Sequence, residues 1–201
     1  MSTVYEYDDE LASQGDNVAL AIDTSGAYVG HFTAASALTA STGTTGVELE
    51  FESDAKEKAN FTLYTRDKDG KPIFGQNKLQ AIMSLFGIRG LKAVPGKVRA
   101  WDKEIEKWGE VDGEVFPDLL ERKIGLVLQK ELITKMTGRD GYKMQLFASF
   151  DPKSQLTSTE IRERKTEPKS IPKILKTLKD KDSRKAPEVA SPSIGAIGGD
   201  Y

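Results

Sequence analysis

The sequence predicts a mainly β protein with five short strands and one helix, which lies between the third and fourth strands. Residues 47–52 alternate strictly between apolar and acidic side chains, which is the period of a strand with one buried face. Residues 76–86 change to apolar spacings of three and four, which place one stripe of a helix against a core. The apolar residues of this stripe are Leu79, Ile82, Met83 and Phe86.

The remaining strands are predicted in chain order from composition and alternation. Residues 26–33 are rich in aromatic and β-branched residues, which favour strands. Residues 60–66 alternate again and lead into an Asp-Gly turn at 67–71, where glycine supplies the positive φ of a tight turn. Residues 122–132 and 142–150 close the series, each with apolar side chains on one face.

This order of strands around one helix matches the OB-fold, a five-stranded and partly open barrel. A generic α+β sheet with the same order is the alternative. We expect residues 23–162 to form the OB-fold-like domain, with an irregular insert at 88–118 that carries both tryptophans. Residues 1–22 read as an acidic flexible arm, and residues 163–201 as a disordered tail rich in Lys and Pro, with one short helix at 171–178.

Composition excludes most catalytic chemistry. The chain of 201 residues has no cysteine and a single histidine, His31, so thiolate zinc sites, cysteine nucleophiles and disulfide scaffolds are excluded. Residues 67–70 resemble the start of a calcium loop, but Lys78 stands where that loop needs a bidentate glutamate. The sequence also lacks nucleophile and phosphate-loop motifs. We therefore expect no enzyme, no catalytic residue, no metal and no cofactor.

The net charge of −2 conceals a separation of charge along the chain. Residues 1–55 contain ten acidic residues and no Lys or Arg, whereas residues 56–143 contain 18 Lys and Arg against 13 Asp and Glu. Such a chain can bind a polyanion on one face; an ordinary mixed surface is the alternative. There is no apolar run of membrane-spanning length and the N-terminus lacks a signal-peptide pattern, so we expect a cytoplasmic protein without membrane contact.

Aromatic and basic residues lie close together at three places: the end of the third strand, the insert, and the turn before the last strand. Single-stranded nucleic acid is bound by stacking bases on aromatic rings beside cations that follow the phosphates. In an OB-fold the ligand lies on strands two and three and on the loops beside them. The candidate nucleic-acid-binding residues are Tyr64, Arg66, Lys97, Arg99, Trp101, Lys107, Trp108, Lys135, Arg139, Tyr142 and Lys143.

One feature of the second strand opposes this interpretation. Glu48, Glu50 and Glu52 all face outward, next to the proposed groove, where negative charge repels phosphates. Either this strand turns its outer face away from the ligand, or the groove lies mainly on the third strand, the insert and the last turn.

Two runs of the sequence resemble a family of phage-encoded single-stranded DNA-binding-like proteins found with recombination and replication genes. The first is NFTLYTRDKDGKPIFGQNKLQAIMSLFGIRGL, and the second is FPDLLERKIGLVLQKELI followed by GYKMQLFASFDPKSQLTSTEI. The resemblance covers residues 26–162 and implies an OB-fold that coats single strands without chemistry, in the cytoplasm of the infected bacterial host.

The C-terminus is similar to the tails by which bacterial single-strand binders recruit other proteins. It ends in Asp200 and Tyr201, although it has one acidic residue near the end where those tails have several. These two residues are therefore the candidate partner-binding residues, and phage recombinase or replication proteins are the candidate partners.

We expect a sequence-tolerant single-stranded DNA-binding protein that acts in phage DNA replication or recombination. The alternative is a protein-interaction module on the same fold, either a recombinase loader or an inhibitor of a host protein. The acidic residues 1–55 favour this alternative, because they could dock on a basic partner or mimic nucleic acid. A homo-oligomer is compatible with both functions.

Overall fold

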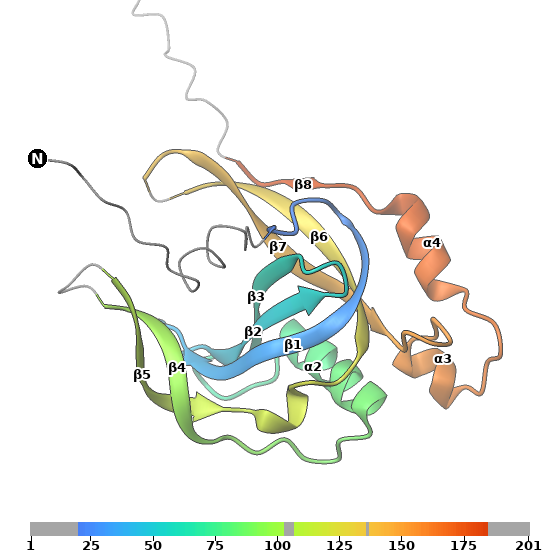
Figure 1. Ribbon diagram of the computed structural model, residues 1–201, viewed down its shortest axis with the longest axis horizontal. Helices are drawn as coiled ribbons and strands as arrows, with labels where there is room; N and C mark the ends of the chain where they lie inside the picture. The colour runs from blue at the N-terminus through green and yellow to red at the C-terminus, as the bar shows by residue number, and fades with distance from the viewer. Residues whose placement is uncertain (1–19, 103–106, 136, 185–201) are drawn as a thin grey trace, which may run out of the picture.

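The computed structural model describes residues 20–102, 107–135 and 137–184 (Figure 1). They form a mainly β structure with few helices. The elements are β1 (Gly26–Thr39), β2 (Thr45–Ser53), β3 (Lys58–Arg66), α2 (Phe74–Phe86), β4 (Val94–Asp102), β5 (Lys107–Val115), a short 3-10 helix (Pro117–Leu119), β6 (Ile124–Thr134), β7 (Asp140–Phe150), α3 (Ser158–Arg162), α4 (Ser170–Thr177) and β8 (Lys181–Asp182).

The strands form one open sheet of eight strands, in which every pairing is antiparallel except that of β6 with β8. The order is β3-β2-β1-β5-β4, and β6 joins β1 and carries β7 and β8. The expected count of five strands is therefore wrong. Among the described residues no ladder joins β3 to β7, so the sheet is not closed; α2 packs against both strands instead.

The predicted alternation sets the core. Val47, Leu49 and Phe51 of β2 are buried, as the sequence predicts. The Phe32 ring of β1 lies at the centre and meets three other rings edge to face, at centroid distances of 6.1 to 6.4 Å. Those rings belong to Phe51, Phe61 and Phe86. Edge-to-face contacts of this kind add to the free energy of burial.

Strand β1 is long because it pairs with two different strands. Residues 26–30 pair with β6, and residues 30–39 pair with β2. The strand changes partner at Gly30, where a Cβ atom would overlap the Glu52 carbonyl and the Phe51 ring. A bulge follows between Phe32 and Ala34, and bulges bend a strand. Glycine at position 30 is thus required by a close backbone approach.

The predicted insert at 88–118 is not irregular, because β4 and β5 form a β-hairpin within it. Its cross-strand partners include Lys97 with Asp112 and Arg99 with Glu110. Opposite charges facing each other across an antiparallel pair stabilise a hairpin. The hairpin joins the body through the pairing of Val115 with Ser36 of β1.

The segment 163–184 is not a disordered tail, because α4 packs on the outer face of the sheet. Ile171, Ile174 and Leu178 contact a second apolar cluster that contains Val127 and Phe150. The short helix expected at 171–178 is observed as α4, and β8 then pairs with Glu131 and Leu132 of β6. The flexible arm predicted for residues 1–22 is wrong at its end, because Ile22 is buried in the core and the backbones of Leu20 and Ile22 hydrogen-bond to Lys58. Residues 1–19 and 185–201 lie outside the described residues, so the arm and the disordered tail stay predictions there.

Glu160 ties α3 to α4 although the residue is only 1% exposed. Its carboxylate accepts hydrogen bonds from the Thr157 amide (2.9 Å), the Lys169 amide (3.0 Å), and the Ser170 amide (2.8 Å) and hydroxyl (2.9 Å). Burial alone would raise the pKa of Glu160, but these donors outweigh it and lower the pKa to about 2. An ionised carboxylate therefore joins α3 to the start of α4, in addition to the apolar contacts of α4 and the pairing of β8.

Substituting Gly30→Ala should destabilise the protein by about 3 kcal/mol, because the new methyl group meets rigid backbone at the bend of β1. Gly90→Ala is the matched control, since a Cβ there meets nothing within 4 Å. Urea denaturation followed by circular dichroism measures both free energies of unfolding. Equal stability of the two variants would show that β1 accommodates a side chain at position 30.

Acid should weaken the anchor at Glu160. Its folded pKa of about 2 lies below the ordinary 4.5, so its contribution is complete above pH 4.5 and is lost as the pH falls toward 2. Glu160→Gln should cost about 2 kcal/mol at pH 7, and the difference from wild type should shrink at pH 3. The exposed Glu163→Gln is the control. Urea denaturation at both pH values gives the result, and a constant difference would contradict the assignment.

Candidate nucleic-acid interface

A groove of about 860 Å³ lies between the β4–β5 hairpin and the outer face of β1, β2 and β3. In Figure 1 this hairpin stands at the lower left, while the β6–β7 hairpin extends toward the upper left. A groove of this volume is in the usual range for a ligand site. Its polar lining residues are Thr33, Ser36, Glu48, Glu50, Asn60, Lys97, Arg99 and Glu110.

Strand register explains which side chains face the groove. Because Val47, Leu49 and Phe51 point into the core, the residues between them on β2 point outward. Glu48 lies opposite Ser36 of β1 and Thr62 of β3, and Glu50 lies opposite Asn60.

The hairpin supplies the cations of the groove. Lys97 and Arg99 are exposed and line it, and their contact with a ligand stays a prediction. Lys97 also forms an ion pair of 2.7 Å with Asp112 on β5. The hairpin wall of the groove therefore carries Lys97 and Arg99 beside Glu110, whereas the sheet wall carries Glu48 and Glu50.

Three predicted residues near the tip of this hairpin have no described side chains. Trp101 and Trp108 are cross-strand partners by backbone register, and Lys107 is the partner of Asp102. The side chains of Trp101, Lys107 and Trp108 lie outside the described residues, so their contact with bases stays a prediction.

The β6–β7 hairpin carries a second group of predicted residues. Tyr142 is 37% exposed, and the Lys130 ammonium lies 4.8 Å from its ring centroid, within cation–π range. Lys135 and Arg139 are exposed on either side of the connecting turn. This hairpin therefore has one cation beside an aromatic face and two more near its turn, and single strands are bound by aromatic rings and cations of this kind.

Lys143, the fourth predicted residue of this group, is engaged by a buried acid. Its ammonium lies 3.0 Å from the carboxylate of Glu131, which also accepts from Lys181 (2.7 Å) and the Ser183 hydroxyl (2.6 Å). Hydrogen bonds from Lys181 and Ser183, and then from Lys143, lower the pKa of Glu131 to about 2. Because Glu131 stays ionised, Lys143 contributes less free charge than the sequence suggests.

Tyr64 and Arg66 occupy the end of β3, outside the groove lining. Tyr64 is 44% exposed. The Arg66 guanidinium donates a hydrogen bond of 2.9 Å to the Gly70 carbonyl and so braces the turn that follows β3. The predicted residues therefore form three groups rather than one continuous set, and among those whose side chains are described only Lys97 and Arg99 line the groove.

Sequence reasoning missed two exposed phenylalanines, one on α2 and one on β7. Phe74 at the start of α2 is 71% exposed, and Phe147 on β7 is 46% exposed. The Lys78 ammonium lies 4.8 Å from the Phe74 ring centroid and donates to the Leu146 carbonyl, which brings α2 and β7 together. The alternation of β7 was a usable signal, because Leu146 points into the core and Phe147 therefore falls outside it.

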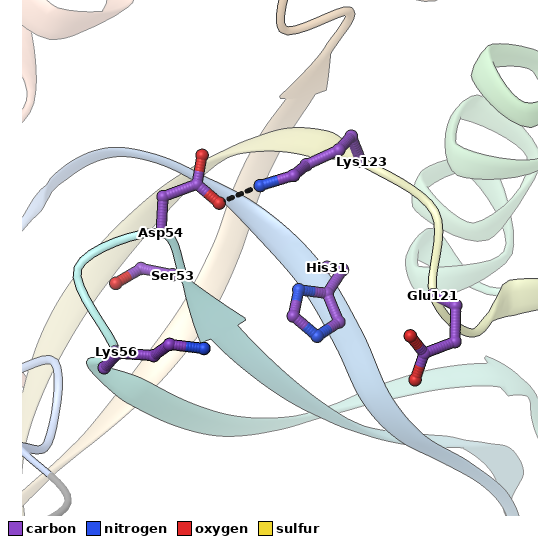
Figure 2. A pocket seen from close by; sticks show the side chains of 6 residues that line it. All are labelled: His31, Ser53, Asp54, Lys56, Glu121 and Lys123. Carbon is purple, nitrogen blue, oxygen red and sulfur yellow. Dashed lines mark hydrogen bonds and ion pairs between the residues drawn. The ribbon is translucent and has the colours of Figure 1, made fainter.

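His31 lines a second, smaller pocket of about 490 Å³ (Figure 2). Asp54 and Lys123 form an ion pair at its rim. The Ser53 hydroxyl points away from His31 and donates to Glu57 at 3.5 Å. Opposite charges thus neutralise one another here, and the histidine and the hydroxyl are not arranged as a base and a nucleophile.

Among the described residues, every helix is too short or too polar to cross a bilayer. Within the same residues, acidic and histidine side chains form no group that could hold a metal ion. Asp200 and Tyr201, the candidate partner-binding residues, lie outside the described part. No protein-family model and no curated protein matches this sequence.

Proposed function

We propose that this protein binds single-stranded DNA with little sequence preference and acts in phage DNA replication or recombination. The observation that carries the proposal is the groove, which lies on the outer face of three adjacent strands under a hairpin that places Lys97 and Arg99 in its lining. The phage context comes from the sequence resemblance alone. Binding of this kind requires no catalytic residue, cofactor or metal.

The finer fold assignment belongs to the same proposal. The order β1-β2-β3-α2-β6-β7 is that of a five-stranded OB-fold, with the β4–β5 hairpin inserted after the helix and β8 added at the end. On that assignment the groove lies on the face of strands two and three, where OB-folds bind their ligands. The β6–β7 turn is then the loop between strands four and five, which OB-folds also use to bind oligonucleotides. The DNA strand that contacts Lys97 and Arg99 would then also contact Lys130, Arg139 and Tyr142 on the β6–β7 hairpin.

Partners and location follow from the function as further proposals. The protein would work in the cytoplasm of the infected host, where phage DNA is replicated. Phage recombinase or replication proteins would be recruited by the C-terminal residues Asp200 and Tyr201.

A dT oligonucleotide of about 30 bases should quench the tryptophan fluorescence of the protein when it is titrated in. The affinity of the protein for this oligonucleotide should fall as the salt concentration rises. Lys97→Ala/Arg99→Ala should weaken binding about tenfold and flatten the salt dependence, because two phosphate contacts are lost. Lys173→Ala/Lys176→Ala removes the same charge from exposed positions on α4, on the other side of the molecule (Figure 1), and should bind like wild type.

Either of two results would contradict this function. One is a flat titration, confirmed by the absence of a mobility shift at low salt. The other is equal weakening in both double variants, which would mean that only net charge matters and that the groove is not the site.

A protein-interaction module on the same fold is the second candidate function. The exposed phenyl rings of Phe74 and Phe147 favour it, because exposed aromatic residues are enriched at protein interfaces. If this function holds and DNA binding fails, Phe74→Ala/Phe147→Ala should abolish association with the protein partner while leaving the free energy of unfolding nearly unchanged.

A further inference from the structure

The groove contains carboxylates that a surface for phosphates does not need. Glu48 and Glu50 line it from β2. Within the described part of the chain neither residue forms an ion pair or a side-chain hydrogen bond, whereas Glu52 on the same strand pairs with Lys56 at 2.8 Å and with Lys58 at 3.4 Å. The carboxylates of Glu48 and Glu50 are therefore available to a ligand.

Their neighbours make this wall of the groove polar across three strands. Asn60 of β3 lies opposite Glu50, and Ser36 of β1 lies opposite Glu48, and all four residues line the groove. An ionised carboxylate can only accept hydrogen bonds. The sheet side of the groove therefore attracts donor groups and repels phosphates.

The opposite wall supplies the cations of the groove. Lys97 and Arg99 of the hairpin carry donors and positive charge, beside Glu110 on the neighbouring strand. The charge of Lys97 is shared with Asp112, with which it forms an ion pair. A single strand is asymmetric in the same sense, since its phosphates only accept while some bases donate. One orientation satisfies both walls: phosphates lie toward the hairpin and base edges lie toward Glu48 and Glu50.

The base edges that donate are the exocyclic amino groups. Cytosine carries the N4 amino group, which carboxylates of Glu and Asp accept from in known complexes, whereas thymine presents a carbonyl oxygen at that position. A carboxylate facing the carbonyl of thymine or uracil leaves two acceptors in contact, which is unfavourable.

We propose that Glu48 and Glu50 bind the exocyclic amino groups of bases, so that the groove prefers cytosine to thymine or uracil. This inference rests on the proposed function and adds a base preference to it. It also gives the acidic face of β2, which opposes phosphate binding, a role in the same site.

Oligonucleotides of deoxycytidine and deoxyuridine test the proposal, because neither base has the methyl group of thymine and the two differ at the position in question. The full chain should bind the dC oligonucleotide about fivefold more tightly than the dU oligonucleotide. Glu48→Gln/Glu50→Gln should bring this ratio close to one and strengthen dU binding, because the glutamine amide can donate to the uracil carbonyl. Glu163→Gln/Glu167→Gln makes the same charge change at exposed positions and should keep the ratio.

The possible outcomes distinguish the base preference from single-stranded DNA binding itself. Equal binding of both oligonucleotides by wild type, or an unchanged ratio in Glu48→Gln/Glu50→Gln, would overturn the base preference while single-strand binding stands. Failure of every oligonucleotide to bind would overturn the proposed function itself. Circular dichroism confirms that the variant is folded, and the single variant Glu48→Gln, at an exposed position, should show an intermediate ratio.

Discussion

The bend of β1 at Gly30 is the constraint on which the rest of the structure depends. One continuous strand pairs with β2 over its second part and with β6 over its first part, and the change of partner needs a residue without a side chain. The bend turns the inner faces of β2, β3, β6 and β7 toward a common core around Phe32. It also leaves the outer faces of β1, β2 and β3 open to form one wall of the groove.

The predictable parts of this fold are those in which one face is apolar and the other polar. Residues 47–52 and 76–86 show this contrast in the sequence, and the structure confirms the strand and the helix. The β4–β5 hairpin could not be predicted from the sequence, because its segment lacks apolar alternation. Charge pairs such as Lys97 with Asp112 hold it instead. The order of segment 163–184 is not evident from the sequence, because its Lys and Pro content suggests disorder. The contacts that hold it, such as those of Ile171, Glu160 and Glu131, depend on the packed structure.

The candidate site was predicted from residues that are adjacent in the sequence. Such a prediction cannot include contacts between residues that only the fold brings together. Aromatic and basic residues adjacent in sequence do mark exposed positions, as Tyr142 and Lys97 show. Sequence neighbours could not reveal that Glu131 engages Lys143 or that Arg66 braces a turn, because those partners depend on the packed structure. Nor could they place Glu48 opposite the hairpin, which is a consequence of how the insert folds over the sheet.

The double pairing of β1 also has a consequence for the order in which the chain folds. The β1–β2 and β2–β3 pairs are local and can form as soon as those residues leave the ribosome. The β1–β6 ladder joins residues about 100 positions apart, such as Gly26 and Leu128, and closing so long a loop is slow. Until β6 is synthesised, the first part of β1 exposes an unpaired strand edge, which is the stage at which the nascent protein is most prone to aggregate.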